Sequence, residues 1–241
     1  MSSGLRARGI AAVLLDIEGT TTPIAFVHDV LFPFARRELA GFLRSEFATP
    51  QVHAAMARLS DEHAADLARG DAPPPLADDA VAYAHWLMDR DRKSPGLKDL
   101  QGLIWERGYR SGQLRGQVYP DVPAAMRRWR ADGLEVAIYS SGSALAQRLL
   151  FESTAAGDLT PMLSRFFDTA MGPKRAPDSY FRIAGALGRE PRQILFVSDI
   201  VDELEAARAA GLDTRLSIRP GNSPQCGAER FVAIRSFDEV T

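Results

Sequence analysis

The sequence predicts an α/β fold in which helices cover both faces of a parallel sheet. Three short apolar runs have the length and composition of strands buried on both faces, at residues 11–15, 136–139 and 194–197. Segments with apolar residues at helical spacing alternate with these runs. Because successive parallel strands are joined by right-handed crossovers through a helix, this alternation indicates a parallel sheet.

Each predicted strand ends at polar residues. The first ends at Asp16, the second at Ser140, and the third at Ser198 and Asp199. Helices are expected at residues 122–131, 144–151, 179–187 and 202–210, and a glycine suited to a C-terminal cap follows three of them. Functional groups on such sheets gather beyond the carboxyl ends of the strands. We therefore expect the polar residues after the three strands to share one site.

The stretch from about residue 26 to residue 116 has a different character. It contains no convincing strand, and helices are expected at residues 31–43, 52–68, 77–91 and 97–112. These helices either belong to the outer layer of the core or form a domain of their own. Four consecutive helices interrupt the alternation, which favours a separate domain. We expect an α/β core at residues 1–23 and 117–241, and a helical cap at residues 24–116.

Composition excludes several other classes of protein. The 241 residues are 46% hydrophobic, and the formal net charge of -2 offers no basic excess for nucleic acid or an anionic membrane. The single cysteine, Cys226, rules out an internal disulfide and a multi-cysteine metal site. No apolar run approaches the ~20 residues needed to span a bilayer. We expect a soluble, cytoplasmic protein whose partner is a small molecule.

Two carboxylates follow the first predicted strand. Asp16 and Glu18 enter the loop at the sheet edge, where Gly19 permits a tight turn away from it. Asp and Gly are also ordinary residues of a turn that ends a strand. Taken alone, the motif fits both interpretations.

Residues after the later strands favour phosphate chemistry. Ser140 and Ser141 precede a helix, where hydroxyls and backbone N–H groups form an anion site, although a helix cap alone also explains one serine. Lys174 either neutralises a phosphate or is an ordinary surface lysine. Asp199 ends the strand opposite Asp16, which suits a hard cation between the two. Together the set matches aspartyl-phosphate chemistry.

The sequence resembles the haloacid dehalogenase superfamily, whose four motifs these residues represent in order. Within it, the chain is similar to the acireductone synthases, the bifunctional enolase-phosphatases of methionine salvage. The most specific match is the run Asp16-Ile17-Glu18-Gly19-Thr20-Thr21-Thr22-Pro23-Ile24. Further matches span nearly the whole chain: Phe26-Val27, Asp91-Arg92-Lys93, Leu97-Lys98, Leu100-Gln101-Gly102, Trp105, Tyr139-Ser140-Ser141-Gly142-Ser143, Ala146-Gln147, Leu149-Leu150-Phe151, Gly157-Asp158-Leu159, Phe167-Asp168 and Arg219-Pro220-Gly221-Asn222.

The resemblance implies a Rossmann-type core with an inserted helical cap, and a reaction on 2,3-diketo-5-methylthiopentyl-1-phosphate. The diketone is expected to be enolised, and the enol phosphate is then hydrolysed to acireductone and phosphate. Asp16 is the expected nucleophile, and Ser140, Ser141 and Lys174 are the expected phosphate ligands.

The resemblance also implies one Mg²⁺ per chain, held by Asp16, Asp199 and Glu18. Superfamily phosphatases usually carry Asp at the position of Glu18. We therefore assign Glu18 to metal binding first, through its backbone carbonyl, and to acid–base catalysis second. Glu203 is expected to orient Lys174 or a metal-bound water.

Lys98 and Trp105 are the candidate substrate contacts of the cap. The alternative for Lys98, as for Arg92 and Lys93, is a solvated helix face. The alternative for Trp105 is packing within the cap. Residues 219–222 are expected to form a turn without a catalytic role, and the family suggests a monomer.

Other functions remain as alternatives. The nearest is another capped phosphatase of the superfamily that acts on a small sugar phosphate, but Glu18 and the three threonines argue against it. A haloacid dehalogenase would not need Asp199 and Lys174 arranged for metal and phosphate, and its turnover would survive EDTA. A receiver-type signalling module would carry no helical insert after the first strand.

Overall fold

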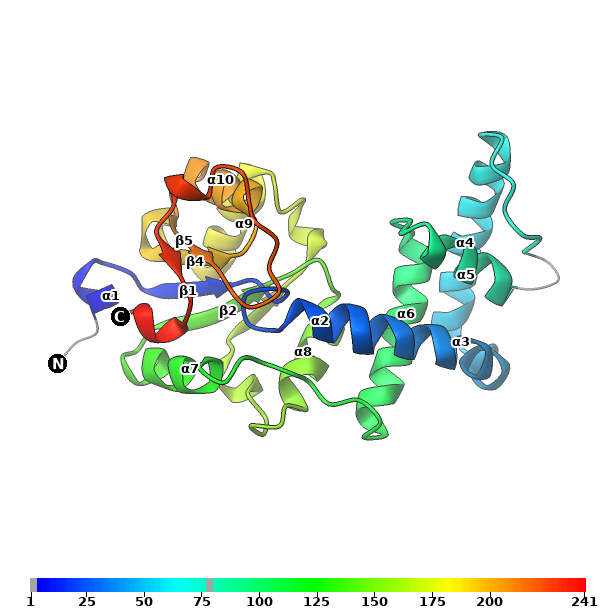
Figure 1. Cartoon of the computed structure of the whole chain (residues 1–241), viewed down its shortest axis with the longest axis horizontal. Coiled ribbons are helices and arrows are strands. Elements are labelled where there is room, and N and C mark those ends of the chain that lie inside the picture. Colours follow the sequence, from blue (N-terminus) through cyan, green and yellow to red (C-terminus); the bar gives the residue numbers. More distant parts are fainter. Residues whose placement is uncertain (1–3, 77–79) are drawn as a thin grey trace. The chain divides into compact units, whose positions relative to one another are not determined.

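The computed structural model describes residues 4–76 and 80–241 (Figure 1). The chain divides into two compact units. The core unit contains the chain up to Val27 and from Leu114 to Thr241, and the helical unit contains His28–Gln113. Asp16 and every residue expected to bind phosphate or metal belong to the core unit.

A parallel sheet forms the centre of the core unit. In the part of the chain that the structure describes, it has six strands in the order β3-β2-β1-β4-β5-β6, and all neighbours pair in parallel. The predicted α/β fold with a parallel sheet is therefore confirmed. The strands are β1 (Ala12–Leu15), β2 (Glu135–Tyr139), β3 (Arg165–Phe167), β4 (Ile194–Ser198), β5 (Asp213–Ser217) and β6 (Ala233–Ile234).

The register of the central strands brings their carboxyl ends to one edge. Leu15 of β1 pairs with Ile138 of β2 on one side and with Val197 of β4 on the other. All four residues of β1 are buried, as a central strand covered on both faces requires. The residues that follow β1, β2 and β4 are consequently neighbours in space.

Sequence analysis did not predict β3, β5 and β6, and their composition explains why. In β5, half-buried Asp213 and Arg215 alternate with buried Thr214 and Leu216, so the strand lacks a continuous apolar run. β3 and β6 are three and two residues long and lie at the two edges of the sheet. Short edge strands carry little hydrophobic signal.

Helices cover both faces of this sheet. Apolar residues of α9 (Pro177–Leu187) and α10 (Val201–Ala209) form one buried cluster with Leu14, Tyr139 and Phe196. Figure 1 shows α7 (Val122–Ala131) on the opposite side of the sheet from α9 and α10. The other helices of this unit are α1 (Gly4–Ala7), α2 (Ile24–Phe26) and α8 (Ala144–Glu152). The four helices expected in the core are all present, with small shifts at their ends.

The helical unit contains α3 (Phe32–Glu46), α4 (Pro50–Ala68), α5 (Ala80–Asp89) and α6 (Pro95–Arg110). Residues 77–79 of the helix expected at 77–91 lie outside the described residues. Thr49 and Ser94 cap α4 and α6, because their side chains accept hydrogen bonds from the backbone three residues later. α4 and α6 approach closely at Gly96, where a Cβ would meet Leu59 at 2.8 Å.

A buried carboxylate in the helical unit is surrounded by hydrogen-bond donors. The carboxylate of Asp66 accepts hydrogen bonds from the Tyr83 hydroxyl at 2.8 Å, from Arg92 at 2.6 Å, and from Arg69. Burial alone raises the pKa of Asp66, but the hydrogen bonds from Tyr83 and Arg92 outweigh burial and hold this pKa below its ordinary value. Arg92 is therefore an internal partner of Asp66, which neither interpretation from the sequence anticipated.

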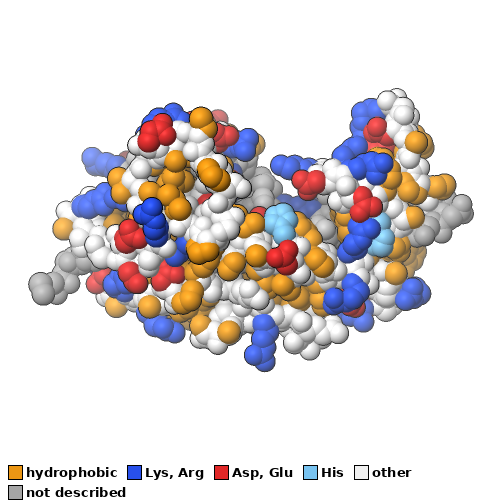
Figure 2. Space-filling view, in the orientation of Figure 1, with side chains coloured by type: hydrophobic (Ala, Val, Ile, Leu, Met, Phe, Trp, Pro, Cys, Tyr) orange, Lys and Arg blue, Asp and Glu red, His pale blue; other side chains and the backbone are white. Residues whose placement is uncertain are grey.

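The distribution of surface charge agrees with the nearly balanced net charge of the sequence. On the face shown in Figure 2, Lys and Arg side chains are interspersed with Asp and Glu side chains. Among the helices of the described residues, none is both long enough and apolar enough to cross a membrane.

Candidate active site at the carboxyl edge of the sheet

Asp16 stands at the carboxyl end of the central strand and is 4% exposed. Its backbone N–H donates to the Val197 carbonyl at 3.0 Å, which extends the strand pairing to this residue. Lys174 Nζ donates to Asp16 Oδ1 at 2.6 Å and pairs with Glu203 Oε2 at 2.7 Å. A single ammonium therefore bridges two buried carboxylates that come from distant parts of the chain.

The end of β4 supplies the next two polar groups. Ser198 Oγ donates to Glu203 Oε2 at 2.9 Å and lies 3.5 Å from Asp16 Oδ2. Asp199 follows directly and is 6% exposed. Glu203 lies in the first turn of α10 and is thus held by both Lys174 and Ser198. The structure brings Asp16, Lys174, Asp199 and Glu203 together as one cluster.

The carboxylates of this cluster are close enough for their negative charges to repel one another. Burial is the main reason that the pKa of Asp199 is raised to about 7, and the charges of Asp16 and Glu203 raise it further. Burial and Asp16 also raise the pKa of Glu203, despite its contact with Lys174. Burial lowers the pKa of Lys174, but both carboxylates outweigh burial and place this pKa above its ordinary value. Among the described residues, Lys174 pairs with Asp16 and Glu203, and its single positive charge does not balance the three carboxyl groups of the cluster.

This excess of negative charge fits a divalent cation at Asp16 and Asp199. The described residues nevertheless contain no group of three or more His, Cys, Asp or Glu side chains arranged to hold a metal ion. An ion at these two carboxylates must complete its shell with backbone, water or phosphate oxygens, all of which Mg²⁺ accepts. The donor set therefore suits Mg²⁺ and does not suit a metal that prefers nitrogen or sulfur.

The loop after Asp16 closes against Asp199. Gly19 has a φ of +67°, and a Cβ at this position would overlap the Asp199 carboxylate. Glu18, which is half-buried, pairs with Thr22 across this loop, and the Gly19 N–H donates to the Thr22 carbonyl at 2.8 Å. The glycine is thus required both for the turn and for the close approach.

The serines after β2 form a separate, locally ordered loop. Ser140 is buried and Ser141 is exposed. Ser140 Oγ accepts from the Gly142 N–H at 3.4 Å, and Ser143 Oγ caps α8 by accepting from the Ala146 N–H at 3.2 Å. Within the described residues, neither Ser140 nor Ser141 hydrogen-bonds to Asp16 or Lys174.

Comparisons with known proteins identify the family. A model of haloacid dehalogenase-like hydrolases matches residues 10–211. A protein of Synechococcus elongatus named Enolase-phosphatase E1 is 53% identical over 96% of this chain and 98% of its own length. Proteins of the same name from Sorangium cellulosum and Drosophila melanogaster are 48% and 47% identical, over 95% and 92% of this chain and 96% and 88% of their own. The chain belongs to the enolase-phosphatase E1 family of haloacid dehalogenase-like hydrolases.

Solved structures share the fold of this chain. The UTR4 protein of Saccharomyces cerevisiae is 32% identical, with a TM-score of 0.76 over 95% of this chain and 99% of that chain. CbbY of Rhodobacter sphaeroides, solved in complex with phosphate, shares the fold with a TM-score of 0.60 at 18% identity, over 96% of each chain. The family confirms the expected enzyme class and function: a phosphatase with enolase activity, the acireductone synthase of methionine salvage.

The expected cap contacts lie in the helical unit of this enolase-phosphatase. Lys98 is exposed on α6. Trp105 is half-buried, its Nε1 donates to the Leu31 carbonyl at 2.8 Å, and its ring lies 6.1 Å from that of Phe32. The indole is thus anchored within the unit and keeps part of its surface accessible.

Two polar features around the candidate site were not predicted from the sequence. Gln147 Nε2 donates to the carbonyls of Gly142 and Phe167, both at 2.8 Å, and so braces the serine loop from α8. Asn222 and Arg219, expected to form a turn without a catalytic role, hydrogen-bond to the loop after Asp16. These residues lie in stretches that match the family, but the sequence does not show that Gln147 reaches Phe167 or that Arg219 and Asn222 reach the loop after Asp16.

Proposed function

We propose that this chain converts 2,3-diketo-5-methylthiopentyl-1-phosphate to acireductone, 1,2-dihydroxy-3-keto-5-methylthiopentene, and phosphate. Enolisation precedes hydrolysis, and hydrolysis passes through an aspartyl-phosphate. The observation that carries the hydrolytic half is the contact of Lys174 Nζ with Asp16 Oδ1, at 2.6 Å. An ammonium held at this distance lies beside the attacking oxygen, where it can compensate the charge of an arriving phosphoryl group.

Asp16 acts as the nucleophile. Its carboxylate attacks phosphorus, and the bond to the leaving oxygen breaks as the acyl-phosphate forms. Lys174 compensates charge on the transferring group, and the hydroxyls and N–H groups of Ser140 and Ser141 bind its other oxygens. Glu203, which pairs with Lys174 at 2.7 Å, fixes the ammonium between the two carboxylates.

Glu18 carries the acid–base role in this half-reaction. It protonates the leaving oxygen and then takes a proton from the water that attacks the acyl-phosphate, which restores the free Asp16 carboxylate. Its place in the loop two residues after Asp16 supports this role.

Asp16, Asp199 and the backbone carbonyl of Glu18 would hold one Mg²⁺ per chain. A bound Mg²⁺ would screen the repulsion between the anionic nucleophile and the anionic phosphate, and would stabilise enolate charge in the first step. The raised pKa of Asp199, caused by burial and by the nearby charges of Asp16 and Glu203, supports a cation at this position.

The helical unit, expected as a cap at residues 24–116, is proposed to select the substrate. Lys98 and Trp105 are its proposed contacts with the diketone and the methylthio tail, respectively. We further propose that the enzyme acts as a cytoplasmic monomer, without a nucleic-acid or membrane partner.

One experiment tests substrate, metal and both half-reactions. The diketone phosphate is added with and without Mg²⁺, and the ultraviolet absorbance of the enediol and the release of phosphate are recorded together. We expect both signals with Mg²⁺ and no phosphate release after chelation. Phosphate release from sugar phosphates but not from the diketone phosphate would overturn the substrate assignment. Turnover that survives chelation would overturn the metal assignment.

A further inference from the structure

The loop that carries Asp16 and Glu18 is tightly folded on itself. The N–H groups of Thr20, Thr21 and Thr22 lie 3.2, 3.0 and 2.8 Å from the carbonyl oxygen of Ile17, on which all three converge. The Thr21 hydroxyl also donates to the Asp16 carbonyl at 3.0 Å. These hydrogen bonds use the carbonyls of Ile17 and Asp16. The carbonyls of residues 19–21 therefore have to accept hydrogen bonds from other segments.

Donors from two distant segments meet these carbonyls. The Gly19 carbonyl accepts from Ser217 Oγ at 3.1 Å and from Asn222 Nδ2 at 3.0 Å. The Thr20 carbonyl accepts from Arg219 Nε at 3.3 Å. The Thr21 carbonyl accepts from the Tyr119 N–H at 2.9 Å. Three successive carbonyls of the loop are thus held from outside.

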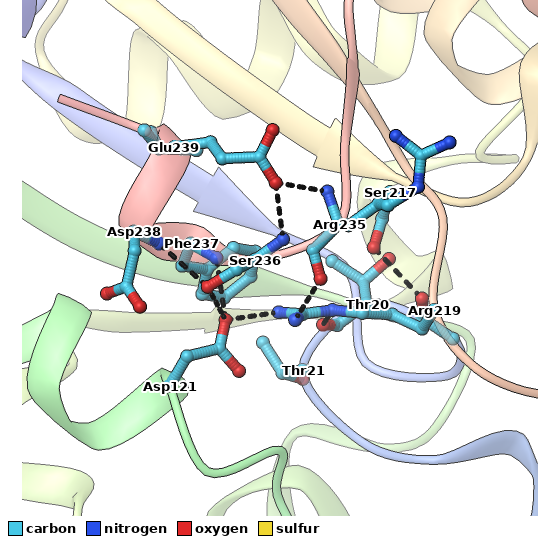
Figure 3. Close-up of polar contacts among 12 residues, drawn as sticks. Thr20, Thr21, Asp121, Ser217, Arg219, Arg235, Ser236, Phe237, Asp238 and Glu239 are labelled. Carbon is cyan, nitrogen blue, oxygen red and sulfur yellow. Dashed lines mark hydrogen bonds and ion pairs between the residues drawn. The ribbon is translucent and has the colours of Figure 1, made fainter.

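Arg219 is itself fixed on every side, as Figure 3 shows in part. Its guanidinium pairs with Asp121 Oδ2 at 2.8 Å and donates to the Arg235 carbonyl at 2.9 Å. The rings of Tyr119 and Phe237 lie 4.6 and 4.7 Å from its central carbon. Its side chain is only 4% exposed, and its contacts hold the guanidinium in one position.

Asp121 extends this arrangement to the end of the chain. Besides Arg219, its Oδ2 accepts from the Phe237 N–H at 2.6 Å and from Ser236 Oγ at 3.2 Å (Figure 3). The segment after β6 is therefore joined, through one carboxylate and one guanidinium, to the backbone that follows the nucleophile. Removing one partner of a buried, hydrogen-bonded ion pair is strongly destabilising, because the other charge is left buried and unpaired.

We propose that Arg219, held by Asp121 and assisted by Asn222, is a positioning residue for metal binding. It holds the Thr20 carbonyl, and Asn222 holds the Gly19 carbonyl, so that the adjoining Glu18 carbonyl and the Asp16 carboxylate keep the placement that the metal site needs. This inference rests on the proposed function, because it concerns the same cation. The close contact between Gly19 and Asp199 gives the loop no alternative position on that side.

Lysine cannot replace arginine in this role. Arg219 uses three nitrogens in three directions and places a flat guanidinium between two rings, whereas a lysine offers one compact ammonium. Arg219→Lys keeps the charge opposite Asp121 but removes the donor to Thr20. It therefore tests the position of the loop without leaving a buried carboxylate unpaired.

The test is the binding of Mn²⁺ to the metal-free protein, measured by electron paramagnetic resonance, with no substrate present. We expect Arg219→Lys to bind Mn²⁺ about ten-fold more weakly, the size of effect seen when the support of a metal ligand is lost. Its kcat should fall while the KM for the diketone phosphate stays near that of the wild type. Arg127→Lys, the same change at an exposed arginine of α7, should match the wild type in both measurements.

A second variant keeps the test decisive if Arg219→Lys does not fold. Asn222→Ala removes a donor to the Gly19 carbonyl without changing any charge, and it should also weaken Mn²⁺ binding. If the variants melt earlier but bind Mn²⁺ as tightly as the wild type, Arg219 is merely structural and the inference is wrong. If the wild type itself fails to bind Mn²⁺, the proposed metal site fails, and this inference fails with it.

Discussion

The carboxylate of Asp199 occupies the space where a side chain on Gly19 would stand. Gly19 also adopts a φ of +67°, so two independent constraints require glycine at this position. The loop that follows Asp16, the proposed nucleophile, therefore lies directly against Asp199, the proposed metal ligand. A change at Gly19 should disturb both.

Gly19→Ala should abolish activity and weaken Mg²⁺ binding, because the new Cβ displaces either the loop or Asp199. The positive φ alone should cost about 1 kcal/mol of unfolding free energy. Gly188→Ala is the matched control, since Gly188 has a φ of +63° and open space around its Cα. In urea unfolding, Gly188→Ala should lose only the cost of the positive φ, and Gly19→Ala should lose more because its Cβ also meets Asp199. Only Gly19→Ala should lose phosphate release. Wild-type turnover in Gly19→Ala would contradict this account of the loop.

Asp16→Asn should remove phosphate release while leaving the fold intact. The amide is nearly isosteric with the carboxylate but does not attack phosphorus, so we expect a loss of about 10³-fold or more in kcat. Circular dichroism and phosphate release are the measurements. Asp202→Asn, at an exposed position of α10, should retain full turnover. Substantial turnover in Asp16→Asn would place the phosphoryl acceptor at another residue.

Lys174→Ala should lower kcat/KM by about 10²–10³-fold, because the charge that compensates the transferring phosphoryl group is lost. Steady-state kinetics on the diketone phosphate measure this effect. Arg175→Ala removes a neighbouring exposed cation and should have little effect. An unchanged rate in Lys174→Ala would show that the ammonium only neutralises Asp16 and Glu203 in the resting protein.

Metal binding should depend on pH through Asp199. Burial, with the charges of Asp16 and Glu203, raises the pKa of this carboxyl to about 7 in the metal-free protein. Below that pH a bound proton must leave before the metal enters, so Mg²⁺ affinity should fall by up to about ten-fold per pH unit. Titration calorimetry at pH 6 and pH 8 should show proton release only at the lower pH. Equal affinity at both values would be incompatible with this interpretation.

The raised pKa of Asp199 also makes the free energy of unfolding depend on pH. Because the pKa of Asp199 is higher in the folded than in the unfolded protein, this group favours folding at low pH, and its contribution is lost as the pH rises through about 7. The metal-free protein should therefore gain stability from Asp199→Asn at pH 8 and very little at pH 5. Thermal unfolding at the two pH values checks this, and a gain of equal size at both would contradict it.

Lys98→Ala should lower kcat/KM for the diketone phosphate by about ten-fold, if the helical unit selects the substrate. Turnover of a simple aryl phosphate, which has neither the diketone nor the tail, should be unaffected. Arg58→Ala, at an exposed position of α4, serves as a control within the same unit. Equal losses on both substrates would argue against a role in selection.

The sequence predicted the central strands and the site they carry, because both depend on local signals. Buried strands such as β1 and β4 are continuous apolar runs, and Asp16 and Asp199 directly follow them. β5 escaped prediction because its buried residues alternate with charged ones. Its alternation of half-buried and buried residues is recognised as a strand only when its pairing in the sheet is known.

The partners of individual side chains could not be predicted in this way. The contact of Arg219 with Thr20 joins residues 199 positions apart, and no spacing rule links them. Lys174 was a candidate because of its motif, yet its shared pairing with Asp16 and Glu203 emerges only from the folded sheet. The sequence shows which residue types follow each strand, but which side chains contact one another depends on how the strands are arranged in the sheet.

The chain leaves the core unit at Val27 and rejoins it at Leu114. Asp16 and Glu18 precede this excursion, and the other proposed phosphate and metal ligands follow it, so all the proposed ligands lie within one unit. The inserted segment can therefore vary in sequence without changing these ligands, and under the proposed function such variation would alter which phosphate ester the enzyme accepts.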